Sequence, residues 1–68
     1  MNVQARVAEY IRSNGIMQKF VVDKTGFSPT KVSMILNSKQ VMTADDFVAF
    51  CNALGKEPND FVDHPEKE

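Results

Sequence analysis

The sequence has few of the residues that staple small proteins together or bind metals. It has one cysteine, Cys51, so no disulfide can form within the chain. It also has one histidine, His64, and a lone Cys with a lone His makes neither a metal cage nor a catalytic pair. A chain of 68 residues buries only about 60% of its unfolded surface. We therefore expect one small domain that depends on dense helix packing or on a partner subunit.

Long apolar runs, targeting signals and catalytic motifs are absent as well. No stretch approaches the roughly 20 apolar residues that cross a bilayer, and the amino terminus lacks the pattern of a secretory signal. Paired carboxylates in a pocket, a phosphate-binding glycine loop and a metal cluster are also missing, which argues against an enzyme and against a cofactor. The balance of 43% hydrophobic and 25% charged residues is typical of a globular protein. We expect a cytoplasmic protein with no membrane partner.

Charge of both signs is present but unevenly distributed. The formal net charge is -1, a balance that at first argues against a nucleic-acid partner. Residues 1–14 nevertheless carry +1, residues 15–40 carry +3 and residues 41–68 carry -5. No acidic residue lies between Thr25 and Met42. The basic middle of the chain is therefore the candidate surface for a polyanion.

Apolar residues recur at spacings of three and four, which predicts an all-helical fold. The predicted helices span residues 3–13, 17–24, 29–36 and 44–54, with a brief fifth helix that begins at Pro58. Asn2, Ser28 and Thr43 are the expected N-caps, and Pro29 suits the first position of a helix. The predicted inward side chains are Val3, Val7, Tyr10, Ile11, Phe20, Val21, Val22, Val32, Ile35, Leu36, Phe47, Phe50, Cys51, Leu54, Phe61 and Val62.

The second and third predicted helices are short, joined by a turn at Gly26-Phe27-Ser28, and the third is polar on its outer face. This pattern is typical of a helix-turn-helix. From about Val7 to Val62 the chain resembles the Cro and lambda-repressor-like (XRE) family, in which five short helices form a compact domain. The residues that carry the resemblance are Gly15-Ile16 with Gln18, Val21-Val22 with Gly26, Val32-Ser33 with Ile35 and Asn37, Lys39, Thr43 with Phe47, Ala53-Leu54-Gly55, and Asp60-Phe61.

The resemblance implies sequence-specific binding of double-stranded DNA, with the third helix in the major groove. It implies one helix-turn-helix domain over residues 1–63 and a flexible tail at 64–68. Gln18 then contacts a phosphate and braces the third helix. The positions that meet bases are Pro29, Thr30, Ser33 and Met34, with Lys31 beside them. The expected backbone or site-edge contacts are Ser28, Asn37, Lys39 and Gln40, and Lys19 is a further candidate for a phosphate contact.

Five residues depart from the usual pattern of the family: Pro29, Met17, Val22, which replaces a small residue, Ser38, and Leu36, which replaces an often polar residue. Pro29 stands where many relatives have a long polar side chain, so it offers only apolar contact. Met34, on the outer face, is a candidate for contact with a thymine methyl or with a partner chain. Met17 replaces a hydroxyl N-cap, and Ser38 replaces a common glycine.

Two functions remain open from the sequence. The first is a bacterial or phage transcriptional regulator that represses from an operator as a homodimer, since one helix-turn-helix buries too little surface alone. The expected dimer surface is the exposed part of the fourth and fifth helices, around residues 60–62, or the tail, and regulation then comes from concentration, a partner protein or proteolysis. The alternative is a protein-interaction module on the same fold, in which the acidic carboxyl-terminal third binds a partner protein.

Overall fold

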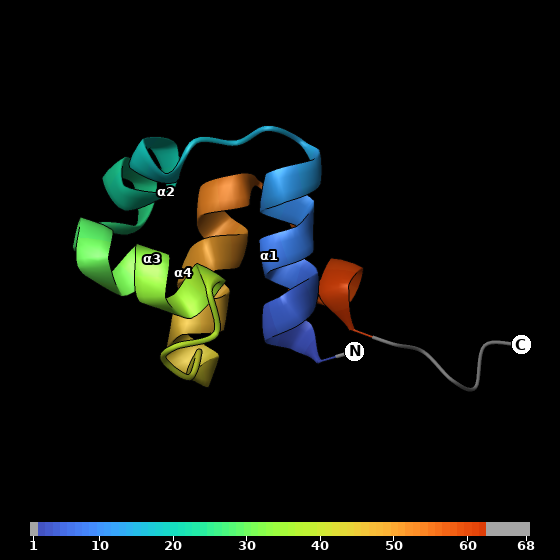
Figure 1. Cartoon of the computed structure of the whole chain (residues 1–68). Coiled ribbons are helices and arrows are strands. Elements are labelled where there is room, and N and C mark those ends of the chain that lie inside the picture. Colours follow the sequence, from blue (N-terminus) through green and yellow to red (C-terminus); the bar gives the residue numbers. More distant parts are fainter. Residues whose placement is uncertain (1, 63–68) are drawn as a thin grey trace, which may run out of the picture.

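The computed structural model describes residues 2–62, which form four α-helices, one short 3-10 helix and no strand (Figure 1). The elements are α1 (Val3–Ser13), α2 (Gln18–Thr25), α3 (Pro29–Leu36), α4 (Ala44–Leu54) and the 3-10 helix η1 (Pro58–Phe61). The all-helical prediction is confirmed, and the four long elements agree with it to within one residue. The fifth helix is a single 3-10 turn. The predicted tail at 64–68, with His64, lies outside the described residues.

Side-chain caps fix three of the helix starts, as predicted. The Asn2 side chain accepts a hydrogen bond from the Ala5 amide at 2.7 Å, and Ser28 Oγ accepts one from the Lys31 amide at 3.1 Å. At α4, Thr43 and Asp46 form a reciprocal capping box, in which each side chain accepts from the other residue's amide at 3.1 Å. α2 has Met17 at its N-cap position, where no side chain caps the helix.

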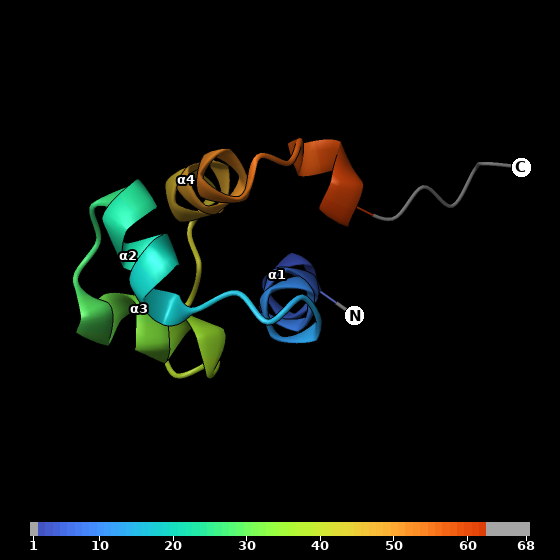
Figure 2. The same cartoon turned by 90° about the horizontal axis from the view of Figure 1, so that it is seen from above.

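The helices pack against one another around one core. α2 packs against both α3 and α4, α1 packs against α3, and η1 packs against α1 and α4. Viewed from above, α2 and α3 lie on one side of the molecule and η1 on the other, with α1 and α4 between them (Figure 2). One face of α3 therefore lies against the core, and its opposite face is left at the surface.

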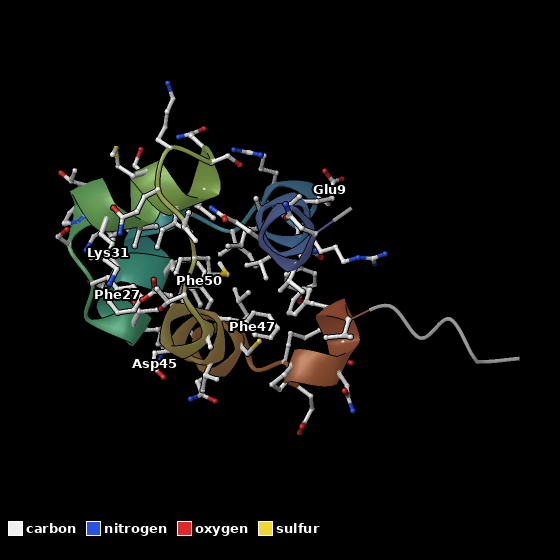
Figure 3. The ribbon with its side chains drawn as sticks, turned by 90° about the horizontal axis from the view of Figure 1, so that it is seen from below. Glu9, Phe27, Lys31, Asp45, Phe47 and Phe50 are labelled. Atoms are coloured by element: carbon white, nitrogen blue, oxygen red, sulfur yellow. The ribbon has the colours of Figure 1, made fainter. Side chains whose placement is uncertain are left out.

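Ten buried apolar residues form the core, and all helices contribute to it. They are Val7, Ala8, Ile11, Val21, Val32, Ile35, Leu36, Phe50, Cys51 and Phe61. Phe47 and Phe50 point inward between the helices (Figure 3). The Phe61 ring anchors η1 through edge-to-face contacts with Tyr10 at 5.7 Å and Phe47 at 6.2 Å between centroids. Cys51 is buried as expected, and this burial, with Asp60 and Glu57 nearby, raises the pKa of its thiol.

Two residues that we expected inside lie at the surface. Phe20 is 43% exposed, because the eight residues of α2 bury only Val21 and Phe20 lies about 100° around the helix from it. Val62 is 40% exposed because it follows η1 in an extended conformation, after the turn that buries Phe61. Phe27 takes the place of Phe20: it comes from the turn between α2 and α3, and its ring lies 6.0 Å from that of Phe50.

Candidate nucleic-acid interface

A glutamine on α1 holds the carboxyl end of α3 and the loop that follows it. The Gln4 amide nitrogen donates to the Ile35 carbonyl and to the Gln40 carbonyl, both at 2.8 Å. Its amide oxygen accepts from the Met42 amide at 3.2 Å. All of the hydrogen-bonding groups of the side chain are thus used to hold residues 35–42 against α1.

Arg12 provides the second link between α1 and α3. Its guanidinium donates to the Leu36 carbonyl at 2.8 Å and to the Asn37 side-chain oxygen at 3.2 Å. The side-chain nitrogen of Asn37, Nδ2, in turn donates to the Ser33 carbonyl at 2.9 Å and lies 3.4 Å from Ser33 Oγ. The positive charge of Arg12 also suits the carboxyl end of α3, because the last turn of a helix carries partial negative charge.

Neither link was predicted from the sequence, although one signal was available. Gln4 is spaced three and seven residues from the buried Val7 and Ile11, so a polar side chain lies in register with the apolar stripe of α1. Arg12 follows the buried Ala8 by four residues. The bracing that the resemblance implied for Gln18 is not made, because the exposed Gln18 side chain forms no hydrogen bond in the described part of the chain. Gln4 and Arg12 brace α3 instead.

The turn after α3 directs the next residues outward. Ser38 has a φ of +59°, in the left-handed region, and its amide donates to the Ile35 carbonyl at 3.2 Å. The Lys39 amide donates to the Met34 carbonyl at 2.8 Å, which completes a Schellman motif with serine in the position that glycine usually takes. Lys39 and Gln40 follow this turn and are both exposed.

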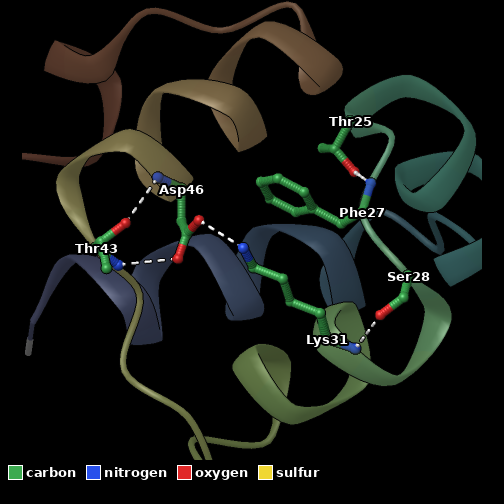
Figure 4. Close-up of polar contacts among 6 residues, drawn as sticks. All are labelled: Thr25, Phe27, Ser28, Lys31, Thr43 and Asp46. Carbon is green, nitrogen blue, oxygen red and sulfur yellow. Dashed lines mark hydrogen bonds and ion pairs between the residues drawn. The ribbon is translucent and has the colours of Figure 1, made fainter.

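Lys31 does not lie on the outer face of α3, contrary to our prediction. Its ammonium lies 3.1 Å from Asp46 Oδ1 and 4.1 Å from the centroid of the Phe27 ring (Figures 3 and 4). The physical reason is the burial of Asp46, which is only 6% exposed and needs a compensating charge. Lys31 therefore links α3 to α4. Because its ammonium is engaged with Asp46, Lys31 is no longer a candidate for contact with DNA.

The Asp46 carboxylate is held in its charged form by this cluster. Burial opposes ionisation, but the hydrogen bonds from Thr43 and Lys31 and the charge of Lys31 outweigh it, so the pKa of Asp46 lies below its usual value. Sequence reasoning placed this aspartate in the first turn of a helix but gave no sign that it is buried.

The other predicted contact residues gather along α3 and the loop after it. Ser33 is half-buried, Met34 is 38% exposed, and the remaining members of this set are exposed: Ser28, Pro29, Thr30, Asn37, Lys39 and Gln40. Gln18 and Lys19 are exposed on α2, which packs against α3. Lys19 lies 3.5 Å from Asp23 on the same helix, so a carboxylate offsets part of its charge. Most of the predicted contact residues are thus exposed on α3, on the loop after it and on the adjacent α2.

A shallow apolar depression lies apart from the outer face of α3. It has a volume of about 410 Å³ and is lined by Ile16 and Met17 from the loop before α2, Phe20 from α2, and Leu54 from the end of α4. Lys24 lies beside it, with its ammonium 5.6 Å from the centroid of the Phe20 ring.

Within residues 2–62, no three side chains of His, Cys, Asp or Glu are grouped so as to hold a metal ion. None of the helices in this range is long and apolar enough to cross a membrane. Comparisons of the chain with protein-family models, curated proteins and solved structures give no match.

Proposed function

We propose that the chain binds double-stranded DNA as a transcriptional regulator, with α2 and α3 as a helix-turn-helix and α3 in the major groove. The observation that carries the proposal is the surface centred on α3, which displays short polar and apolar side chains with a lysine at its end. No carboxylate occurs between Lys24 and Ala44, and Asp46, which contacts α3 through Lys31, is paired with that cation. A helix of this kind fits the major groove, where base edges are distinguishable.

The surroundings of α3 supply candidate contacts to the phosphates. Lys39 and Gln40 lie after its carboxyl end, and Ser28 lies at its amino end with a hydroxyl proton still available to donate. Arg12 uses one of its terminal nitrogens within the protein and keeps further N–H groups for an anion. Gln18 and Lys19 on α2 complete the proposed set.

A homodimer on a two-fold symmetric operator is the proposed active form. A single unit of this size buries too little surface for tight specific binding, whereas two units one DNA turn apart share one site. Two exposed apolar side chains support a dimer surface on α4 and after η1: Val48 on α4 is 48% exposed, and Val62 after η1 is 40% exposed. As a repressor, the dimer would act by occupying its operator.

The proposal is tested by selecting bound duplexes from a random DNA pool at about 50 mM and about 200 mM salt. Phosphate contacts should make the recovery of DNA fall steeply between these two concentrations. We expect an inverted repeat whose half-sites lie about 10 base pairs apart. Recovery of no duplex at either concentration would contradict DNA binding.

The apolar depression supports a second candidate function, a protein-interaction module on the same fold. Phe20 and Met17 line it and expose 43% and 69% of their surface. Neighbouring exposed apolar side chains of this kind are typical of protein-interaction sites. In this case the protein binds a partner protein, and the selection recovers no DNA. The absence of acidic residues around α3 favours the first candidate.

A further inference from the structure

The outer face of α3 has few side chains that can recognise bases by strong hydrogen bonds. Guanine is usually recognised by Arg or Lys and adenine by Asn or Gln, through two hydrogen bonds each. The one cation of α3, Lys31, is held by Asp46. Asn37, which caps the end of α3, has its oxygen bonded to Arg12 and its nitrogen bonded to Ser33. Neither side chain is free to pair with a base while these bonds persist.

The side chains that remain on this face are largely apolar at their tips. Thr30 and Met34 are four residues apart and therefore lie on one side of the helix, with Pro29 next to Thr30. Pro29 presents a ring with no polar atom, Thr30 a methyl beside its hydroxyl, and Met34 a thioether that is 38% exposed. Methionine is expected inside a small domain, so its exposure on this face suits a ligand with apolar groups.

Only one natural base offers such a group in the major groove. Thymine has a 5-methyl group there, and the other three unmodified bases present polar atoms or hydrogen. We propose that α3 selects its DNA site chiefly through thymine methyl groups, which contact Pro29, Thr30 and Met34. This inference rests on the proposed function and specifies the chemistry of the site that α3 recognises.

The inference is tested on a duplex recovered by the selection, in which single thymines are replaced by uracil. The replacement removes one methyl and leaves the phosphates and the base pairing unchanged. Affinity, measured by fluorescence anisotropy, should fall about fourfold for each contacted methyl that is removed. Where cytosine replaces a contacted thymine, 5-methylcytosine should recover part of the loss. Equal affinity for the thymine and uracil duplexes would overturn the inference but leave the proposed function standing. If no duplex binds, both fail.

A variant of α3 assigns the methyl contact to a residue. For one thymine of the half-site, M34A should bind the duplex equally well whether that base is thymine or uracil. M17A is the matched control, because Met17 is a second exposed methionine that lies outside α3, at 69% exposure. It should keep the full discrimination. T30S keeps the hydroxyl, removes the methyl and should lose discrimination at a different position. Full discrimination by both M34A and T30S would overturn the inference.

Discussion

At the scale of single residues, Ser38 is the residue in the least favourable backbone conformation. It is the one non-glycine residue with positive φ among residues 2–62, and this conformation costs a residue with a Cβ about 1 kcal/mol or more. We predict that S38G raises the free energy of unfolding, measured by urea denaturation, by up to about 1 kcal/mol, part of the gain being offset by the greater freedom of glycine in the unfolded chain. S38A is the control and should bring no gain. Equal stability of the two variants would contradict the prediction.

Two lysines of the basic segment should respond differently to substitution. K31M keeps the apolar stem beside Phe27 but leaves the Asp46 carboxylate unpaired, so it should lower the free energy of unfolding by about 1–3 kcal/mol. The Lys31 side chain is about one-third exposed (34%), which keeps the loss below that of a fully buried pair. The dependence of DNA affinity on salt should not change.

K39A is the counterpart of this substitution, because Lys39 is exposed and forms no side-chain ion pair within residues 2–62. It should leave stability unchanged and lower the slope of log affinity against log salt by about one, the value for one lost phosphate contact. Denaturation and anisotropy titrations on both variants separate the two roles. A change of the salt slope in K31M, or an unchanged slope in K39A, would contradict the assignment of the phosphate contact to Lys39 rather than to Lys31.

The Asp46 cluster should make stability depend on pH in the acid range. Because the pKa of Asp46 is lowered by folding, its contribution is complete above about pH 4, the usual pKa of an unfolded aspartate, and is lost as pH falls through the lower folded value. We predict that D46N flattens the fall in stability below pH 4, whereas D45N, at the exposed neighbouring position, keeps it. Denaturation curves between about pH 2 and pH 6 measure the difference. Parallel curves for D46N and the unchanged protein would rule out this role.

At the scale of secondary-structure elements, the position of α3 depends on Gln4. Q4M keeps the side chain similar in size but removes one hydrogen bond from each of the Ile35, Gln40 and Met42 backbones. We predict a loss of about 1–3 kcal/mol in stability and faster hydrogen exchange at the Met42 amide. DNA affinity should fall as well, since Lys39 and Gln40 lie on the loop that Gln4 holds.

Q18M provides the matched control, because Gln18 is exposed and makes no side-chain hydrogen bond in the described part of the chain. In Q18M, the Met42 amide should exchange at the same rate as in the unchanged protein. Unchanged protection of this amide in Q4M would show that the loop is held by other contacts.

The elements themselves could be predicted because their limits depend on local chemistry. The caps at Asn2, Ser28 and Thr43 and the first-turn Pro29 act within three residues of their own position, so the sequence is enough to locate them. The spacing of apolar residues likewise located most of the core. The short α2 was the exception, since one residue of rotation decides whether Phe20 or Val21 is buried.

The contacts between elements could not be predicted, because they join residues far apart in the chain. Gln4 bonds to residues 31 to 38 positions away, and Arg12 to residues 24 and 25 positions away. The pairing of Lys31 with Asp46 depends on how α3 meets α4, and so does the packing of Phe27 on Phe50. The residues of the candidate site could therefore be listed from the sequence. The sequence did not show which of them already form contacts within the protein.

At the scale of the whole molecule, the overall charge of -1 gives little guidance to the partner. The acidic residues are concentrated in 41–68, mostly on α4 and beyond, whereas α3 and its loop have none. Under the proposed function, this separation would let a slightly acidic protein present the α3 surface to DNA. The apolar depression at Met17 and Phe20 is a second surface, formed by residues outside α3.

The central claim, that DNA binds on the α3 surface, is tested most directly by NMR. Amide shifts of the labelled chain would be followed while a selected duplex, or a random one at about 50 mM salt, is added. We predict shifts centred on residues 28–34 and 37–40, with smaller ones at Gln18 and Lys19, that are reversed at about 200 mM salt for the random duplex. Shifts confined to Ile16, Met17, Phe20 and Leu54, or no shifts with either duplex, would contradict the claim.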